Sequence, residues 1–251
     1  MIPNPIRKVL STMRTHQVRA LLMGGQACVF YGAAQFSRDV DLAVLAEPEN
    51  FGRLRNALNE LKADNIAVPP FEPRFLERGH AVHFRCQHPE AAGMRVDIMT
   101  RMRGVAPFHE LWERRTTLAD NAGCEWDHLA LPDLVTAKKT QRDKDWPMIR
   151  ALVEAHYFAH RETAGAAVDF WLTEARTVEL LRELVARHPA AAKKLISIRP
   201  LLATVISGDA ATIQRALADE EQLERAADAA YWAPLKAELE QLRHQRKISP
   251  P

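Results

Sequence analysis

The chain has 251 residues, of which 47% are hydrophobic and 26% charged, and its formal net charge is +2 at pH 7. This balance is typical of a globular protein of one or two domains and excludes a disordered, fibrous or collagen-like chain. The cysteines form no CxxC pair, so we expect reduced thiols rather than disulfides. The sequence has no signal-peptide core and no run of 18 apolar residues, which predicts a cytoplasmic protein without a membrane partner.

The first half of the chain alternates between strand-like and helix-like patterns. Apolar residues at helical spacing predict helices, and short apolar runs or strict alternation predict strands. In chain order we expect a helix at 6–17, a strand at 18–23, a helix at 26–34, a strand at 38–45, a helix at 47–63, an irregular proline-rich segment at 66–78, strands at 80–86 and 94–100, a helix at 108–115 and weak strands near Thr117 and Trp126. Pro89 and Gly93 predict that the strands at 80–86 and 94–100 form a hairpin.

The second half of the chain carries only helical patterns rich in Ala, Leu, Glu and Arg. Helices are expected at 132–140, 145–160, 166–187, 190–206, 210–217 and 220–246. The sequence therefore predicts an α+β protein, with a mixed sheet flanked by helices in a domain at 1–130 and an α-helical domain at 131–251.

Two carboxylates follow a glycine turn in the segment LLMGGQACVFYGAAQFSRDVDLAV. Gly24-Gly25 would let the backbone approach a ligand, and the start of the next helix is suited to a phosphate. Asp39 and Asp41 project from one face of their strand and repel each other unless a cation lies between them. Carboxylate oxygens suit Mg²⁺ or Mn²⁺, which can also bind substrate phosphates.

Asp97 is a third candidate ligand, because it lies between Val96 and Ile98 in a short apolar strand. A charged residue in such a strand requires a partner or an ion. Three carboxylates on neighbouring strands, beside a phosphate-binding turn, indicate a two-metal nucleotidyl-transfer site. The alternative is a structural carboxylate paired with Arg95 or Arg101.

Together, the glycine pair, the Asp39-Val40-Asp41 strand and the Asp97 strand resemble the polymerase-beta-type nucleotidyltransferase superfamily. The Gly-Gly form and the run LPDLVTAKKTQRDKDWPMI are similar to small bacterial nucleotidyltransferases, which include abortive-infection-type toxins and antibiotic adenylyltransferases. The resemblance covers Leu21 to about Leu152. It implies a nucleotidyltransferase-like mixed sheet and transfer of NMP from an NTP to an acceptor hydroxyl, with release of pyrophosphate.

The resemblance also implies roles for individual residues. Asp39 and Asp41 would bind both metal ions, and Asp97 would complete the catalytic one and help deprotonate the acceptor. The residues expected at the triphosphate are Gly24, Gly25 and Gln26, with Lys138 or Lys139 from the helical domain neutralising its oxygens and Arg142 and Lys144 as weaker candidates. ATP is the expected NTP. The acceptor is left open between tRNA, a protein and a small molecule. The resemblance to toxins of toxin–antitoxin pairs adds an antitoxin protein to the partners it implies.

Other interpretations of the same residues remain. In one of them, the chain is a catalytically silent module of this fold that binds a protein partner. The presence of all three carboxylates argues against this interpretation. A nucleic-acid-binding role of the helical domain is disfavoured because residues 131–251 carry 18 basic and 17 acidic side chains. The lysines near position 138 would alternatively form a solvated helix face.

A second metal site is suggested only by spacing, at His80, His83, Cys86 and His88. On a strand, His83 points away from the face that the other three share. Tetrahedral zinc needs ligands that converge. We therefore expect no stoichiometric zinc.

Overall fold

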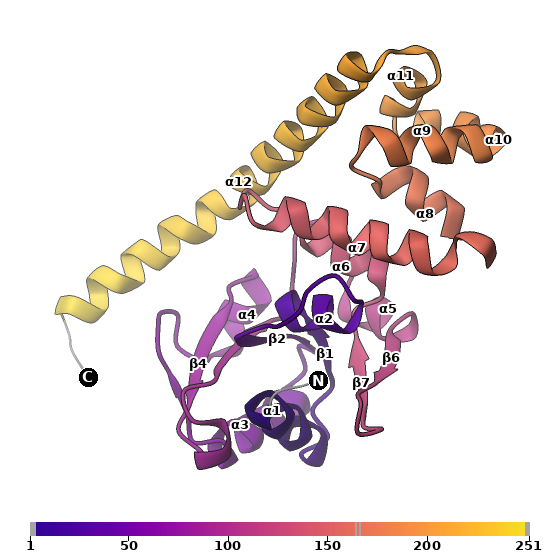
Figure 1. Cartoon of the computed structure of the whole chain (residues 1–251). Coiled ribbons are helices and arrows are strands. Elements are labelled where there is room, and N and C mark those ends of the chain that lie inside the picture. The colour runs from indigo at the N-terminus through magenta and orange to yellow at the C-terminus, as the bar shows by residue number, and fades with distance from the viewer. Residues whose placement is uncertain (1–3, 164, 166, 249–251) are drawn as a thin grey trace. The chain divides into compact units, whose positions relative to one another are not determined.

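The computed structural model describes residues 4–163, 165 and 167–248 (Figure 1). The chain divides into two compact units. The first contains Met1–Phe30, Ala34–Ala137 and Tyr231–Pro251, and the second contains Tyr31–Ala33 and Lys138–Ala230. This division differs from the boundary expected between 130 and 131, because it falls after Ala137 and assigns the C-terminal segment to the first unit.

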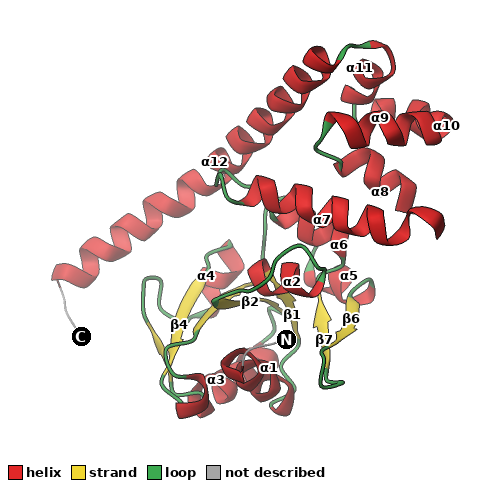
Figure 2. Ribbon diagram, in the orientation of Figure 1, coloured by secondary structure: helices red, strands yellow, loops and turns green. Residues whose placement is uncertain are grey.

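A mixed sheet forms the centre of the first unit (Figure 2). In chain order its strands are β1 (Ala20–Met23), β2 (Asp39–Val44), β3 (Ala63–Asn65), β4 (Val82–Cys86), β5 (Arg95–Met99), β6 (Thr116–Ala119) and β7 (Glu125–His128). Within the described residues the sheet has seven strands in the order β3-β4-β5-β2-β1-β7-β6. The β2–β5 and β1–β7 pairs are parallel and the other pairs are antiparallel, including the expected β4–β5 hairpin. The predicted α+β class is confirmed.

Short helices connect and flank these strands. They are α1 (Asn4–Thr15), α2 (Gly24–Phe30), α3 (Pro48–Glu60), α4 (Pro73–Arg78), the 3-10 helix η1 (Pro89–Ala91), α5 (Phe108–Glu113) and α6 (Leu131–Ala137). The expectation that 66–78 is wholly irregular is wrong for α4. Pro73 supplies a favourable first-turn residue there, and Gly79 ends the helix in the left-handed region with φ of 105°.

The central strands present two chemically different faces. Val40 and Leu42 on β2, and Val96 and Ile98 on β5, are fully or almost fully buried on one face. Figures 1 and 2 show α1 and α3 together on one side of the sheet, and the apolar residues of α1 are buried. The intervening residues of β2 and β5 project from the other face, because successive side chains on a strand alternate. That second face carries the predicted carboxylates.

The second unit is helical. It contains α7 (Asp145–His160), the 3-10 helix η2 (Arg161–Thr163), α8 (Ala167–Glu174), α9 (Val178–Arg187), α10 (Pro189–Lys194), the 3-10 helix η3 (Leu195–Ser197), α11 (Leu201–Ser207) and the start of α12 (Ala210–Ile248), which ends in the first unit. The single helices expected at 166–187 and 190–206 are each divided, and Ala166 lies outside the described residues. Pro200 interrupts the second of them because proline cannot donate a helical hydrogen bond.

The helices expected at 210–217 and 220–246 are one continuous helix, α12. Pro234 lies inside it and does not end it.

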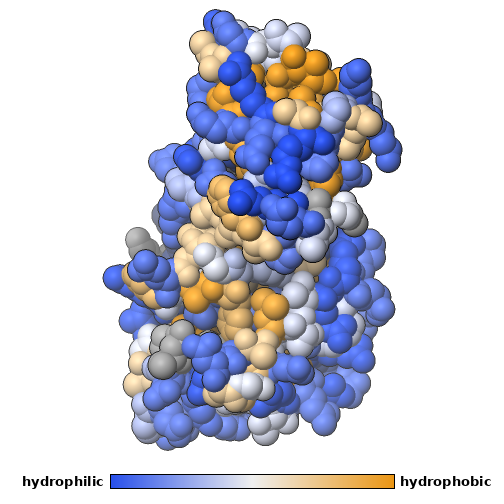
Figure 3. Space-filling model, turned by 45° about the vertical axis from the view of Figure 1, so that its right-hand side comes forward, coloured by the Kyte–Doolittle hydropathy of each residue, from blue (hydrophilic) through white to orange (hydrophobic). Residues whose placement is uncertain are grey.

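Among the described residues, no helix has both the length and the apolar character needed to cross a bilayer. Figure 3 shows hydrophilic residues over most of one face, with apolar residues in small groups.

The buried His128 at the end of β7 gives the fold a pH dependence. Burial lowers the pKa of His128 from 6.5 to about 4, although its Nδ1 lies 2.7 Å from the Trp126 carbonyl oxygen. The unfolded chain therefore takes up a proton below pH 6.5 that the folded chain accepts only near pH 4. We expect the free energy of unfolding to fall by about 2 kcal/mol between pH 7.5 and pH 5 through this group.

Urea denaturation of wild type and His128→Gln at both pH values measures this contribution. The variant should lack that part of the pH dependence, whatever its stability at pH 7.5. His109→Gln is the matched control, because the His109 side chain is 70% exposed. An unchanged pH dependence in His128→Gln would assign the acid sensitivity to other groups.

Candidate active site

The candidate site is organised by the pairing of β2 with β5. In this parallel pair Asp41 is the register partner of Asp97, and Asp39 is the partner of Arg95. Neighbouring strands lie about 4.8 Å apart, and register partners point to the same face. The structure thus brings Asp39, Asp41 and Asp97 onto one face of two adjacent strands, together with Arg95.

Gly24 is packed directly against the carboxylate of Asp41. Its φ is 65°, in the left-handed region, and a Cβ atom added to it would lie 1.9 Å from Asp41 Oδ2. Met23, which precedes Gly24, is the register partner of Asp41 across the β1–β2 pair. Glycine is therefore needed at position 24 both for the backbone conformation and for the space that the Asp41 carboxylate occupies.

Gly25 has a different neighbour. A Cβ atom at Gly25 would lie 2.7 Å from the Ser37 hydroxyl, which donates a hydrogen bond to the carbonyl oxygen of Asp39 at 3.1 Å. The glycine pair is thus fitted to the loop that leads into β2. The sequence pattern alone did not indicate Ser37, because nothing local links it to the glycine turn.

Asp97 is engaged by two side chains from the same sheet face. Its Oδ1 accepts hydrogen bonds from Arg95 Nε at 2.8 Å and from His83 Nδ1 at 2.9 Å. The Arg95 NH2 group lies 3.1 Å from the same His83 nitrogen. Burial raises the pKa of the Asp97 carboxyl, but the hydrogen bonds from His83 and Arg95 outweigh it and hold that pKa below its usual value.

Arg95 acts electrostatically on all three carboxylates. Its pKa is raised first by the hydrogen bond to Asp97, against the effect of burial, and further by attraction to Asp97, Asp39 and Asp41. The Arg95 guanidinium therefore supplies the positive charge that three neighbouring carboxylates require. This observation agrees with part of the alternative interpretation of Asp97, in which Arg95 is its partner.

These residues fit a divalent cation in donor chemistry and in backbone register. All three candidate ligands are carboxylates, the donors that Mg²⁺ and Mn²⁺ prefer, and two of them are direct register partners. In the described part of the chain, however, no three His, Cys, Asp or Glu side chains are gathered closely enough to hold a metal ion. Binding through Asp97 Oδ1 therefore requires competition with Arg95 and His83.

Gln26, the third predicted nucleotide residue, lies on α2 directly after the glycine pair. It is 1% exposed, and neither its Nε2 nor its Oε1 has a hydrogen-bond partner among the described residues. A buried amide without partners is costly. A ligand that supplies both a donor and an acceptor would remove this cost. Because α2 has only seven residues, the Gln26 amide carries more of the argument for a ligand than the helix dipole does.

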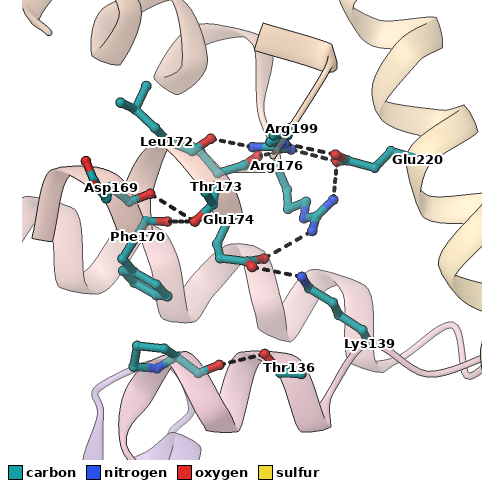
Figure 4. A network of polar contacts seen from close by, with 12 residues as sticks. Thr136, Lys139, Asp169, Phe170, Leu172, Thr173, Glu174, Arg176, Arg199 and Glu220 are labelled. Atoms are coloured by element: carbon teal, nitrogen blue, oxygen red, sulfur yellow. Dashed lines mark hydrogen bonds and ion pairs between the residues drawn. The ribbon is translucent and has the colours of Figure 1, made fainter. Parts of the chain in front are cut away.

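The predicted lysines belong to the second unit and are held in ion pairs there. Lys138 is 8% exposed and its Nζ lies 3.4 Å from Asp145 Oδ1. Lys139 Nζ lies 2.8 Å from Glu174 Oε1, at the edge of the polar network in Figure 4. Glu174 also pairs with Arg176, which is linked through Glu220 to the buried Arg199. These pairs favour a structural role for both lysines.

The weaker candidates lie in the same segment. Arg142 Nε lies 2.7 Å from Asp145 Oδ2, and Lys144 is the residue that precedes α7. Burial raises the pKa of Asp145, but Lys138, Thr140 and Arg142 outweigh it and lower the pKa. This cluster stabilises the start of α7. A role of these cations in phosphate binding stays a prediction.

The residues of the suggested zinc site have separate partners. His80 is buried, and its Nε2 lies 2.8 Å from Glu238 Oε2 on α12, whereas His83 contacts Asp97. Cys86 is buried, and burial raises its thiol pKa to about 11. His88 accepts a hydrogen bond from the backbone of Glu90 at the start of η1.

Sequence reasoning missed His83 and underweighted Arg95 as members of this site. Arg95 is two residues before Asp97 on one strand, so the alternation placed both on one face. His83 comes from β4, where it is the register partner of Asp97. The hairpin register was the signal that could have identified His83, but it depends on the exact length of the turn.

Comparisons with known proteins add only distant similarities. No protein-family model and no curated protein matches the sequence. A crystal structure described as a candidate nucleotidyltransferase from Helicobacter pylori is 14% identical, covers 90% of this chain and 94% of its own, and has a TM-score of 0.39. The JHP933 protein from Helicobacter pylori is also 14% identical, covers 93% of this chain and 94% of its own, and has a TM-score of 0.37.

Proposed function

We propose that the chain is a metal-dependent nucleotidyltransferase that moves NMP from an NTP, ATP in the first instance, to an acceptor hydroxyl. The observation that carries the proposal is the Asp41–Asp97 register on adjacent parallel strands, with the carboxylate of Asp41 seated on Gly24. Three carboxylates on one sheet face beside a glycine pair would repel the phosphates of a nucleotide unless cations lay between them. This repulsion supports Mg²⁺ or Mn²⁺ as the cofactor.

In the proposed reaction the acceptor oxygen forms a bond to the α-phosphorus, the bond to the bridging oxygen breaks, and pyrophosphate leaves. Mg²⁺ held by Asp39, Asp41 and Asp97 would neutralise phosphate charge during this displacement. The Asp97 carboxylate, which is ionised near neutral pH, would accept the proton of the acceptor hydroxyl. The backbone N–H groups of Gly24-Gly25 and the Nε2 group of Gln26 would donate hydrogen bonds to phosphate oxygens. Lys138 and Lys139 could contribute only by leaving their ion pairs.

A second candidate function is a catalytically silent module that binds a protein partner, such as an antitoxin. The contacts of Arg95 and His83 with Asp97 Oδ1 favour it, because they supply this oxygen with hydrogen bonds without a metal ion. The carboxylates of Asp39 and Asp41 favour the enzyme over the silent module, because both lie on the same sheet face as Asp97 and can bind a divalent cation with it. The acceptor of the enzyme would be tRNA, a protein or a small molecule.

Transfer from radiolabelled nucleotides separates these two functions. Purified protein is incubated with each α-labelled NTP and Mg²⁺ in the presence of tRNA, protein extract or an aminoglycoside and lincosamide panel. The enzyme should label one acceptor class and release pyrophosphate in equal amount. Mg²⁺ with ATP should also raise the melting temperature more than either alone. The absence of both effects would favour the silent module.

Arg95→Gln is expected to increase the affinity for Mn²⁺ in the absence of nucleotide. The variant removes the cation that competes for Asp97 Oδ1, so Mn²⁺ should bind roughly tenfold more tightly, as expected for one nearby charge. Electron paramagnetic resonance of free Mn²⁺ measures the affinity directly. Arg85→Gln is the matched control, since exposed Arg85 is the register partner of Arg95 on β4. Equal Mn²⁺ affinities of wild type and Arg95→Gln would contradict the competition.

A further inference from the structure

A cavity of about 310 Å³ lies in the first unit, on the sheet face opposite the carboxylates. Leu22 on β1 and Leu42 on β2 line it, and Leu42 alternates with Asp41 along the strand. Residues of α1, α3, α5, β7 and the segment between α1 and β1 also line it. Its volume is at the lower end of the range for small-molecule sites. The cavity is independent of the proposed nucleotidyl transfer.

The lining contains both aliphatic and aromatic side chains. Leu10, Met13, Leu22 and Leu42 line the cavity yet are at most 5% exposed. Two of the five tryptophans of the chain, Trp112 and Trp126, lie in the same lining. Aromatic rings favour offset or edge-to-face contacts with one another, so the indole edges suit an aromatic ligand.

Two arginines of the lining lie over these indoles without a carboxylate partner. The Arg14 guanidinium carbon is 5.0 Å from the centroid of Trp126, and that of Arg19 is 5.8 Å from the centroid of Trp112. Neither guanidinium forms an ion pair within the described residues. Both side chains belong to exposed residues. The two guanidinium groups are therefore held near the indole rings and remain available to an anion.

The other charged side chains of the lining reduce the positive charge of Arg14 and Arg19 only in part. Arg53 is paired with Glu49 at 2.6 Å, and Asp127 is paired with Arg115 at 3.1 Å. The negative charge of exposed Glu125 offsets one of the two positive charges of Arg14 and Arg19 in the lining. The lining thus combines an excess of positive charge with apolar and aromatic side chains.

We infer that this cavity binds a small planar aromatic anion. Its ring would pack against the buried leucines and the indole edges, because arginine side chains already lie over the indole faces. Its carboxylate or phosphate would pair with Arg14 and Arg19. Guanidinium groups pair with such anions through two parallel hydrogen bonds, and the ligand replaces the missing carboxylate partners. The recognition needs both the ring and the charge.

Calorimetric titration with 1-naphthoate and with its uncharged analogue 1-naphthamide tests both requirements. Wild type should bind 1-naphthoate at least about tenfold more tightly than 1-naphthamide, as expected for a charge-assisted contact. Arg14→Gln combined with Arg19→Gln should remove this preference and leave the weak binding of the amide. Both substitutions are at exposed positions, so the fold should be retained.

Arg55→Gln is the matched control. Exposed Arg55 also lies over an aromatic ring, with its guanidinium carbon 5.2 Å from the centroid of Phe71, but it is not part of the cavity. This variant should bind 1-naphthoate as wild type does. In nitrogen–proton spectra, 1-naphthoate should shift the indole signals of Trp112 and Trp126. Equal affinities for the acid and the amide, equal losses in Arg55→Gln, or shifts confined to other tryptophans would overturn the proposal.

Discussion

Asp41→Asn is expected to reduce NMP transfer by at least about a thousandfold, which corresponds to the loss of several kcal/mol of charge stabilisation by a bound metal ion. Asp39→Asn and Asp97→Asn should have similar effects, because each removes one of three carboxylates from the same sheet face. The measurement is the initial rate of transfer from an α-labelled NTP to the acceptor class that the labelling experiment reveals. Asp64→Asn is the control, since Asp64 is an exposed residue of β3 in the same sheet.

The three variants should differ in stability. Relief of carboxylate repulsion alone predicts that each variant is as stable as wild type or more so. For Asp97 the hydrogen bonds from His83 and Arg95 reverse this expectation, because Asp97→Asn weakens two charge-assisted contacts. Thermal melts at pH 7 check this order. Wild-type transfer rates in all three variants would exclude the proposed two-metal site.

Gly24→Ala is expected to lower the free energy of unfolding by about 4 kcal/mol. Roughly 1–2 kcal/mol comes from a non-glycine residue in the left-handed region, and the remainder from displacement of the Asp41 carboxylate. The added Cβ atom would lie 1.9 Å from Asp41 Oδ2 and 2.7 Å from Asp41 Cβ, so rotation of the carboxylate alone cannot remove the overlap. Urea denaturation monitored by circular dichroism measures the loss.

Two glycines provide controls for the separate contributions. Gly93→Ala measures only the cost of placing alanine in the left-handed backbone region. Gly93 has a φ of 78°, and a Cβ atom there would meet nothing within 4 Å. Gly25→Ala tests a contact that can relax, since its neighbour is the hydroxyl of Ser37. Both should cost about 1–2 kcal/mol. A Gly24→Ala variant no less stable than Gly93→Ala would show that Asp41 does not depend on the space at Gly24.

Several features of the candidate site were determined by short stretches of sequence. Alternation in Asp39-Val40-Asp41 and in Val96-Asp97-Ile98 was sufficient to predict two strands with their carboxylates on one face and apolar residues on the other. The glycine pair was sufficient to predict an abrupt end of the preceding strand. These predictions succeeded because the period of side chains along a strand is a local property.

Other features depended on pairings between distant segments. The register that sets Asp41 beside Asp97, and the hairpin that brings His83 to the same carboxylate, join residues of separate strands. Register follows from the packing of the whole sheet, and a shift of one residue would place each side chain on the opposite face. The fit of Gly24 to Asp41 likewise exists only after β1 and β2 have paired.

The amino-acid sequence by itself determined the α+β class, the helical character of the second half and the chemistry of the carboxylate strands, because composition and periodicity encode them locally. Only the tertiary structure decided the distant partners of the charged side chains. Lys139 pairs with Glu174 and Asp97 with His83, while His80 pairs with Glu238 on α12 across 158 positions of the chain. Long charged side chains pair with whichever opposite charge folding brings within reach, and no local pattern specifies that partner.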